Sequence, residues 1–459
     1  MKKKLLSLLM VGAMTATMLA GCGDSGSGDT NTDAAKDDAG DEAKDDGAAD
    51  SEAAGRDAAV SEGGKTLTVW CWDPAFNIFS MKEAAKVYQK DHPDVTVDVI
   101  ETPWEDIQTK LTTAATSNAL DTLPDIMLVQ DNAFQKNVMT FPDAFTDLTN
   151  SGVDFSQFAA GKTAYSVVDG KNYGVPFDNG AVIACYRTDI LEEAGFTIDD
   201  FTDITFDQYI ENGKKVLEKT GKPLISMQAG ECDLIMMMMQ SAGASLFNED
   251  GTANIQDNAT LKIVMETYKE MKDSGVLIEV NSWDEYISSM TSETVAGTIN
   301  GCWIMASIKT AEDQSGKWAI TNMPSLVGAE GATNYSNNGG SSWAVTSNCK
   351  DTELAFDFLA STFAGSTELY DNIISCGALA TYAPAGDSDA YAQPDEFFGG
   401  DAISSKIVDF STKVPSNITG VYYYEARDAV ATAIINYING GDIDAELKTA
   451  SDTVNNQMQ

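Results

Sequence analysis

Histidine is almost absent from this chain, with one residue, His92, among 459. A zinc site built from several histidines is therefore excluded within the chain. A serine–histidine or cysteine–histidine catalytic pair could use only His92, which precedes Pro93 where a helix is expected to end. We therefore interpret His92 as a helix-terminal side chain that faces water. The sequence also has no Gly-x-Ser-x-Gly elbow, phosphate-binding loop or dinucleotide fingerprint.

Basic residues are scarce, with 29 Lys and Arg against 70 Asp and Glu, and the formal net charge is −41. Nucleic acids and anionic lipid surfaces attract basic proteins, so both are disfavoured as partners. The same balance disfavours a strongly anionic ligand unless local basic groups override the field.

Cysteine is sparse after the first 22 residues, and no Cys-x-x-Cys motif occurs. We interpret the scattered thiols as small buried hydrophobic side chains. Disulfides remain possible, but the spacing identifies no pair. The six residues are Cys71, Cys185, Cys232, Cys302, Cys349 and Cys376.

The first 22 residues have the pattern of a secretory signal peptide. Three lysines precede an uncharged run from Leu5 to Leu19, which is too short to span a bilayer comfortably. The ending Leu-Ala-Gly-Cys resembles the bacterial lipoprotein box, which implies that Cys22 is acylated and anchors the protein to the membrane. The alternative is an ordinary signal peptide in which Cys22 is incidental.

Residues 23–64 consist mainly of Gly, Ser, Ala and Asp, with Val60 as the only large aliphatic side chain. Such a segment buries too little apolar surface to offset its chain entropy, and its like charges repel one another. We therefore expect a disordered acidic tether that holds residues 65–459 away from the membrane.

Residues 65–459 alternate between strand and helix patterns, with β-rich runs at 66–72, 95–100 and 124–129. Alternation of this kind is typical of an α/β fold, and the length exceeds what one core usually organises. We predict two lobes, each a mostly parallel sheet flanked by helices, joined by crossing hinge strands. Lobe 1 is expected at about 65–177 and 338–370, and lobe 2 at about 178–337 and 371–459.

Several segments, taken in order, resemble the extracellular solute-binding proteins of sugar-importing ABC transporters, the maltose-binding-like group. They are Leu67-Thr68-Val69-Trp70, Pro124-Asp125-Ile126-Met127, Tyr173-Gly174-Val175-Pro176 with Tyr186-Arg187, Gly297-Thr298-Ile299-Asn300-Gly301-Cys302-Trp303 and Tyr423-Tyr424-Glu425-Ala426-Arg427. The resemblance implies two lobes that close around a ligand and a non-enzymatic protein that passes a carbohydrate to an ABC permease. It also implies a location at the bacterial cell surface or periplasmic face.

Sugars present apolar C–H faces and hydroxyl rims, so their sites combine aromatic rings with carboxylates and amides. In open α/β sheets these groups gather beyond the carboxyl ends of strands. By resemblance, Trp303 and Tyr423 match stacking aromatics, and Glu231 and Asp131 match polar contacts. The full candidate set is Trp72, Asp73, Gln130, Asp131, Asn179, Glu231, Trp303, Trp343 and Tyr423. Trp70, in mid-strand, is expected in the core.

Two positions depart from the maltose binder: Asp73 replaces a basic residue and Val129 replaces an aromatic one, which argues against maltodextrin itself. Two alternatives stay open: the same fold with a polyamine, peptide or other small solute, and a surface glycosidase that uses two carboxylates. No cofactor or metal is expected. A calcium loop at 247–251 is conceivable, but a plain turn is favoured because the spacing does not fit an EF-hand.

Overall fold

The computed structural model describes residues 65–415 and 417–459. The predicted signal peptide, the lipidation site at Cys22 and the acidic tether lie outside the described residues. Within the described part, no helix has the length and apolar character needed to cross a membrane.

Lobe 1 is organised around three parallel strands, in the order β2–β1–β3, as the alternating pattern predicts. They are β1 (Lys65–Cys71), β2 (Val95–Glu101) and β3 (Ile126–Gln130). A small antiparallel hairpin joins β4 (Val167–Val168) to β5 (Lys171–Asn172). The helices of this lobe are α1 (Asn77–Tyr88), α2 (Trp104–Thr116), α3 (Asp131–Thr140), α4 (Ala160–Thr163), α11 (Thr352–Ser361) and α12 (Thr367–Ile373).

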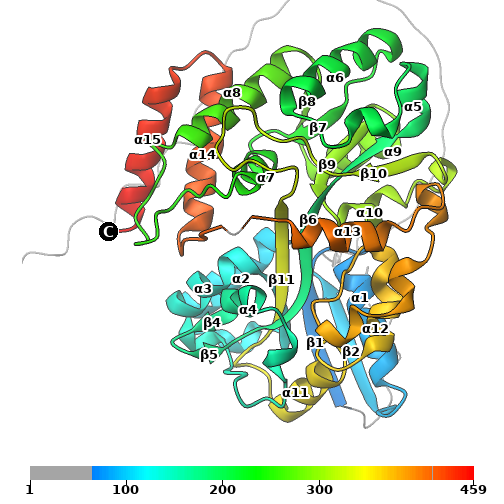
Figure 1. The fold of residues 1–459 in the computed structure, drawn as a ribbon. Helices are drawn as coiled ribbons and strands as arrows, with labels where there is room; N and C mark the ends of the chain where they lie inside the picture. The colour runs from blue at the N-terminus through cyan, green and yellow to red at the C-terminus, as the bar shows by residue number, and fades with distance from the viewer. Residues whose placement is uncertain (1–64, 416) are drawn as a thin grey trace, which may run out of the picture. The chain divides into compact units, whose positions relative to one another are not determined.

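Two long strands run from one lobe into the other (Figure 1). They are β6 (Val175–Arg187) and β11 (Asn337–Val345), which pair antiparallel with each other. β11 also pairs antiparallel with β3, whereas the second half of β6 pairs with β9 (Gly297–Gly301) and β10 (Trp318–Thr321). The predicted crossing strands are therefore confirmed.

The two crossing strands approach closely at Gly180. A Cβ atom there would lie 1.9 Å from the backbone oxygen of Asn338, so only glycine fits without a shift of the backbone. The pairing register is irregular between Asn337 and Gly340. The crossing point thus depends on backbone contact rather than on side-chain packing.

Lobe 2 contains one parallel pair, β7 (Ile225–Gln228) with β8 (Leu277–Val280). Because β6 enters from lobe 1 with its direction already set, β9 and β10 both pair with it antiparallel. Lobe 2 therefore has an antiparallel part, β9–β6–β10, which continues the sheet of lobe 1, and a separate parallel pair, β7–β8, rather than one mostly parallel sheet. Its helices are α5 (Thr188–Glu193), α6 (Phe206–Thr220), α7 (Asp233–Ser241), α8 (Ala259–Asp273), α9 (Trp283–Thr291), α10 (Ile304–Ile308), α13 (Ile403–Thr412), α14 (Tyr423–Ile438) and α15 (Ile443–Gln457).

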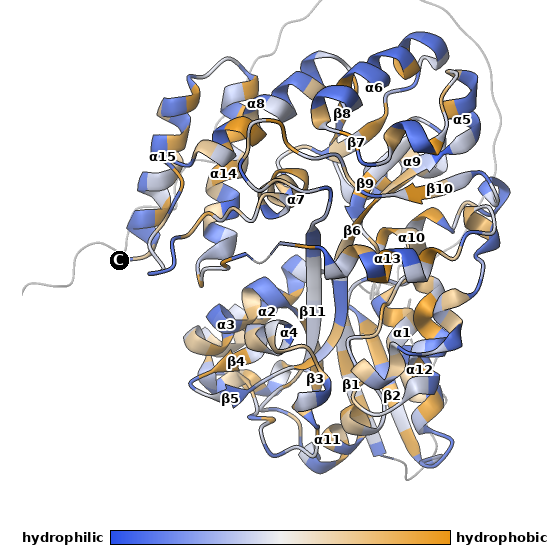
Figure 2. Ribbon diagram, viewed as in Figure 1, coloured by the Kyte–Doolittle hydropathy of each residue, from blue (hydrophilic) through white to orange (hydrophobic). Residues whose placement is uncertain are grey.

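Hydrophobic residues colour stretches of the strands and of the helices around them (Figure 2). Buried side chains on successive residues of a strand point to opposite faces of the sheet. In β3, Ile126 and Leu128 join one buried cluster of lobe 1, while Met127 and Val129 join the cluster on the opposite face. A third cluster fills lobe 2 and includes Met236 to Met239 of α7, which confirms the prediction that these four side chains fill core.

The second segment of lobe 1 extends beyond its expected end at about residue 370. Tyr370, Ile373, Cys376, Ala378 and Ala385 belong to a lobe 1 cluster, whereas Leu379, Tyr391 and the buried residues that follow belong to the lobe 2 cluster. All six cysteines of the described part are buried, as predicted, and they are free thiols. Burial raises the pKa of Cys232 and of Cys349 to about 12.

Local signals also hold. Thr205 and Gln208 form the predicted capping box of α6, and Gly221 ends that helix with a left-handed φ of 72°. His92 follows the end of α1, where its ring stacks on Tyr88 at 4.1 Å and stays half-buried.

Candidate functional site

Aromatic side chains from both lobes meet where β1 and β2 end and where α14 begins. Trp72 follows β1, and its ring centre lies 5.5 Å from that of Trp104, the first residue of α2, with an angle of 62° between the rings. The ring centres of Trp104 and Tyr424 are 6.3 Å apart, and those of Tyr424 and Tyr423 are 5.3 Å apart. All four rings are half-buried, so part of each remains accessible. We call Trp72, Trp104 and Tyr424 the aromatic wall.

Two polar contacts connect lobe 1 with the first turn of α14. The Tyr424 hydroxyl donates a hydrogen bond to Gln130, the residue before α3. Lys136 of α3 forms an ion pair with Glu425 and lies 5.1 Å from the ring centre of Tyr422. These contacts hold the aromatic wall together across the two lobes.

Arg427 lies one turn beyond Tyr424 and connects the wall to lobe 2. Its guanidinium donates to Glu231 and, at 2.9 Å, to Asp233, and it lies 5.8 Å from the ring centre of Tyr424. Burial lowers the pKa of Arg427, but Asp233 and Glu231 more than offset this, so the pKa is raised overall. Burial raises the pKa of Glu231, and the Arg427 charge opposes that rise.

Asn338 links this carboxylate pair to a second aromatic group. Its side-chain amide donates to Asp233 at 3.3 Å and to Asn300 at 2.8 Å, while its backbone oxygen accepts from the Trp303 indole at 3.0 Å. Trp283 lies 5.9 Å from Trp303. A continuous polar chain therefore runs from Trp303 through Asn338, Asp233 and Arg427 to the aromatic wall.

A second charged cluster is buried where α3 and α4 meet the crossing strands β6 and β11. Lys162 forms an ion pair with Asp131 and donates to the Ser341 backbone oxygen at 2.9 Å. Ser342 donates to Asp131 at 2.9 Å, and the Ser341 backbone N–H donates to Asp178 at 2.9 Å. Burial raises the pKa of Asp178 to about 6, although Lys162 opposes the rise. Burial likewise raises the pKa of Asp131.

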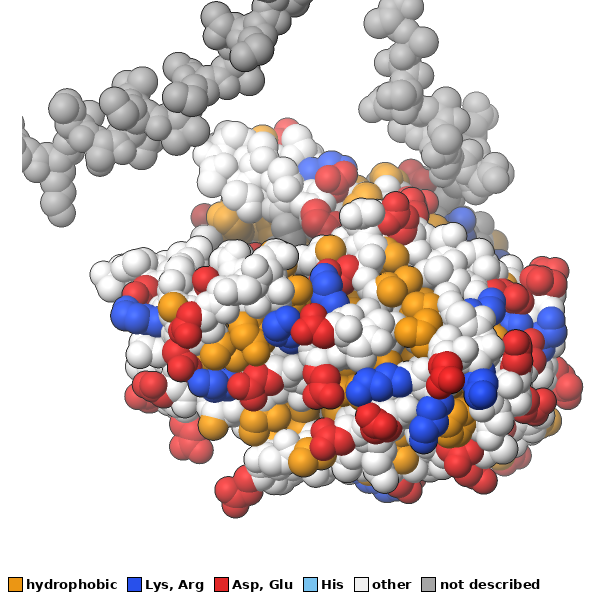
Figure 3. All heavy atoms as spheres, turned by 90° about the horizontal axis from the view of Figure 1, so that it is seen from above, with side chains coloured by type: hydrophobic (Ala, Val, Ile, Leu, Met, Phe, Trp, Pro, Cys, Tyr) orange, Lys and Arg blue, Asp and Glu red, His pale blue; other side chains and the backbone are white. Residues whose placement is uncertain are grey.

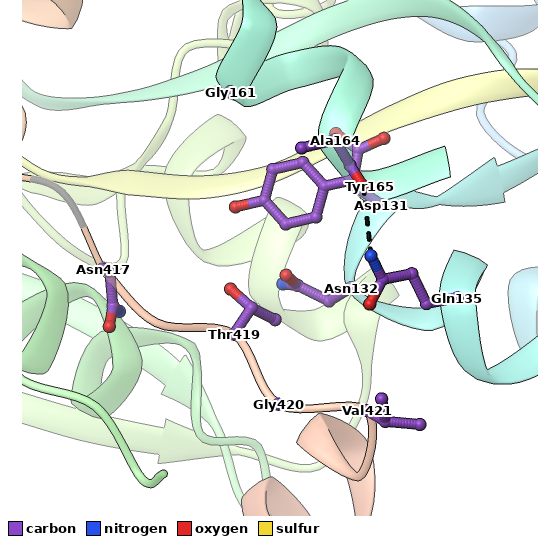
Figure 4. Close-up of a pocket in the computed structure, with 10 residues that line it drawn as sticks. All are labelled: Asp131, Asn132, Gln135, Gly161, Ala164, Tyr165, Asn417, Thr419, Gly420 and Val421. Atoms are coloured by element: carbon purple, nitrogen blue, oxygen red, sulfur yellow. Dashed lines mark hydrogen bonds between the residues drawn. The ribbon is translucent and has the colours of Figure 1, made fainter. Parts of the chain in front are cut away.

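A hollow of about 280 Å³ adjoins this buried cluster (Figure 4). It lies between the first turn of α3, the 161–165 segment and the loop before α14. Gln135 donates across one side to the Ala164 backbone oxygen at 3.1 Å. Its lining consists of Asp131, Asn132, Gln135, Gly161, Ala164, Tyr165, Asn417, Thr419, Gly420 and Val421.

The structure brings five of the predicted site residues into one connected arrangement. Trp72 and Gln130 contact the aromatic wall, Tyr423 packs on Tyr424, and Glu231 and Trp303 belong to the polar chain. The assignment of their roles toward a ligand stays a prediction.

Trp343 does not belong to this arrangement, and its inclusion in the candidate set was wrong. Its side chain is 0% exposed and lies 5.4 Å from Phe177 and 5.3 Å from Phe363 in the core of lobe 1. The strand alternation of β11 points Trp343 to the face that the lobe 1 helices cover. Trp70 differs in the opposite sense: it is half-buried, with Lys110 5.1 Å from its ring centre, rather than a core residue.

Three further candidates have local roles. Asp73 accepts from the backbone N–H groups of Ala75 at 2.9 Å and Phe76 at 3.1 Å, so one of its oxygens shapes the turn after β1. Asp131 is buried and neutralised by Lys162, although it also lines the hollow. Asn179 is half-buried on β6, beside the crossing point.

The candidate set from the sequence did not include Trp104, Tyr424, Asp233 or Arg427. Trp104 follows a β-strand just as Trp72 does, so the strand-end rule applied to the second strand would have found it. Asp233 and Tyr424 carry no separate signal, because each adjoins a stronger candidate. Within the described residues, no group of three or more His, Cys, Asp or Glu side chains could hold a metal ion. At 247–251, Asp250 accepts from Thr252, as expected of a plain turn.

This fold and this arrangement define a two-lobe binding protein, and comparison with known proteins identifies the family. Residues 83–430 match the model of the bacterial extracellular solute-binding proteins, and the chain belongs to that family. The chain is 40% identical to the lactose-binding protein of Rhizobium radiobacter over 394 residues, 86% of this chain and 93% of that protein. It is 24% identical to the arabinooligosaccharide-binding protein of Halalkalibacterium halodurans over 65% of this chain and 67% of that one.

Solved structures share the fold. The ABC transporter associated binding protein of B. animalis subsp. lactis, in complex with β-1,6-galactobiose, has a TM-score of 0.73 and 20% identity, covering 86% of this chain and 97% of that chain. The binding protein of Bifidobacterium longum in complex with lacto-N-biose has a TM-score of 0.70 and 21% identity, covering 86% and 98%. The predicted family and the two-lobe α/β fold are therefore confirmed, and these family members and neighbours are binding proteins.

Proposed function

We propose that this protein captures a neutral disaccharide or short oligosaccharide and delivers it to the permease of an ABC transporter. The observation that carries the proposal is the joining of two aromatic groups, at Trp104 and at Trp303, by a chain of carboxylate, guanidinium and amide groups. Aromatic faces fit the C–H surfaces of pyranose rings, and the polar chain can exchange hydrogen bonds with hydroxyl groups. The 40% identity with a lactose-binding protein makes lactose the first ligand to try.

The charge of the site supports a neutral ligand. Arg427 is matched by two carboxylates, Glu231 and Asp233, so the cluster carries no excess positive charge for an anionic sugar. On the face seen from above, acidic and basic side chains are interspersed, and the basic ones are not gathered into one patch (Figure 3). A uronic or sialylated sugar would therefore bind less well than its neutral counterpart.

Calorimetric titration of the purified protein with lactose tests the proposal. We expect Trp303→Ala to lower affinity for lactose by roughly 30- to 1000-fold, equivalent to losing an aromatic hot spot of about 2–4 kcal/mol. Because Trp303 is only half-buried, the melting temperature without ligand should change little. Lactose binding by Trp303→Ala equal to that of the wild type would contradict this assignment, and heat from a polyamine but from no sugar would favour the non-sugar alternative.

We also propose that Cys22 carries a lipid that holds the protein at the outer face of the cell membrane. The support is the Leu-Ala-Gly-Cys sequence after a basic and apolar leader, followed by a highly acidic low-complexity segment. Metabolic labelling with a palmitate analogue should mark the wild type and leave Cys22→Ala unlabelled. Equal labelling of both proteins would refute the anchor without affecting the sugar site.

A further inference from the structure

Trp104 is the first residue of α2, shortly after the end of β2, and its partly buried ring packs against a core cluster of lobe 1. Its ring meets Trp72 at 62° and Tyr424 at 42°, and all three are half-buried. Rings that met face to face would cover one another, whereas rings at these angles leave faces available for a flat apolar partner. The wall therefore presents partly accessible aromatic surface, with the Arg427 guanidinium 5.8 Å from the ring centre of Tyr424.

The indole N–H groups of four tryptophans differ in whether a protein acceptor is present. Those of Trp303 and Trp318 donate to protein acceptors at 3.0 and 2.9 Å. Among the described residues, Trp72 and Trp104 have no such acceptor, and neither indole nitrogen is sealed from solvent. A half-buried indole with a free donor beside an open ring face can both stack on a sugar and donate to one of its hydroxyl groups.

The polar groups lie between the wall and the second aromatic pair. Arg427 lies against Tyr424, Asp233 bridges Arg427 and Asn338, and Asn338 accepts from Trp303. An aromatic surface at each end of a hydrogen-bonding chain suits a ligand with two apolar ring faces separated by hydroxyl groups.

We propose that Trp104, supported by Trp72 and Tyr424, binds a second sugar ring beyond the ring held at Trp303, and that it thereby favours ligands of two rings over ligands of one. This inference rests on the proposed sugar-binding function. Since Trp72 and Trp104 come from lobe 1 and Tyr424 comes from α14, a ring seated on this wall contacts segments from both lobes at once. Trp104 is therefore a specificity-determining residue for disaccharides over monosaccharides.

Titration calorimetry of the full chain with lactose and with galactose tests the second-ring site. We expect Trp104→Ala to weaken lactose binding by about 10- to 100-fold, while galactose binding stays within about threefold of the wild type. Trp104→Phe should retain most of the lactose affinity, because it keeps an aromatic face. Trp70→Ala is the matched control: Trp70 lies two residues before Trp72, is also half-buried, and is expected to leave lactose affinity unchanged.

The outcomes separate this inference from the proposed function. Lactose binding by Trp104→Ala within threefold of the wild type would overturn the second-ring site and leave the sugar-binding function standing. Equal weakening of lactose and galactose by Trp104→Ala would also overturn it, because the residue would then act on the whole site. A wild-type protein that binds neither sugar nor any longer neutral oligosaccharide would overturn both.

Discussion

Two clusters in this protein carry the same charges but differ in how far they are exposed to solvent. Each places one cation near two carboxylates: Lys162 with Asp131 and Asp178 in the crossing strands, and Arg427 with Glu231 and Asp233 beside the aromatic wall. The side chains of Lys162 and Asp131 are each 6% exposed. Those of Arg427, Asp233 and Glu231 are 18%, 31% and 43% exposed.

The difference lies in how the remaining hydrogen-bonding capacity is used. In the buried cluster, Ser341 and Ser342 donate to the carboxylates, and Lys162 also donates to a backbone oxygen. In the half-exposed cluster, carboxylate oxygens and guanidinium N–H groups still face accessible space. The same three charges therefore serve structure where protein groups satisfy them, and are available for recognition where solvent or a ligand must do so.

Removing the buried cation should have the largest effect on stability. Lys162→Met leaves Asp131 and Asp178 buried without a positive charge, and we expect the free energy of unfolding to fall by about 3–5 kcal/mol. Urea unfolding measures the loss. Adding Asp131→Asn should restore part of it, because one uncompensated carboxylate is then removed. A loss below about 1 kcal/mol for Lys162→Met would show that the two clusters do not differ as described.

The next effect in size is a pH dependence of the free energy of unfolding, caused by Asp178 in the buried cluster. Burial raises the pKa of Asp178 to about 6, so the folded state binds a proton more tightly than the unfolded state does. Stability from this group is therefore highest at low pH and falls as pH rises from about 4 to 6. Asp178→Asn removes this penalty and keeps an acceptor for Ser341. Its stability relative to the wild type should therefore increase by about 2–3 kcal/mol between pH 4 and pH 7.

Urea unfolding of both proteins across this pH range provides the measurement. Asp131 and Lys162, which surround Asp178, remain in both proteins, so the difference isolates the one carboxyl group. A difference that stays constant with pH would contradict the assignment of a raised pKa to Asp178.

Breaking the half-exposed cluster should change stability least and binding most. Arg427→Gln should lower the free energy of unfolding by about 1 kcal/mol or less, since Glu231 and Asp233 can be hydrated. Lactose affinity should fall by about 10- to 100-fold, because charge-assisted hydrogen bonds to the ligand are lost. Lys406→Gln, which removes the cation of the surface pair with Asp401, serves as the control and should leave affinity unchanged. If Arg427→Gln cost as much stability as Lys162→Met, the comparison would fail.

The parts of this protein that sequence reasoning predicted are those with local signals. The alternation of strand and helix patterns located β1, β2 and β3, and the rule that site residues follow strand ends pointed to Trp72 and Gln130. The capping box of α6 and the Met run of α7 are also local, and both hold. The crossing strands followed from the family resemblance.

What sequence reasoning missed depends on contacts between distant segments. Trp343 was named as a candidate, but the direction of its side chain depends on the register of β11 against β3 and β6. Arg427 could not be assigned before Glu231 and Asp233, nearly 200 residues earlier, were known to lie beside it. Lys162 gave no signal, since a single lysine in a polar segment is normally solvated.

The position of α14 near the end of the chain has a consequence for the order in which the protein matures. Tyr423, Tyr424 and Arg427 all lie in its first two turns, and the other members of the aromatic wall and of the polar chain precede them by more than 80 positions. A chain emerging N-terminus first can form both sheets before Tyr424 completes the wall and before Arg427 joins the polar chain. We therefore expect binding competence only once α14 docks.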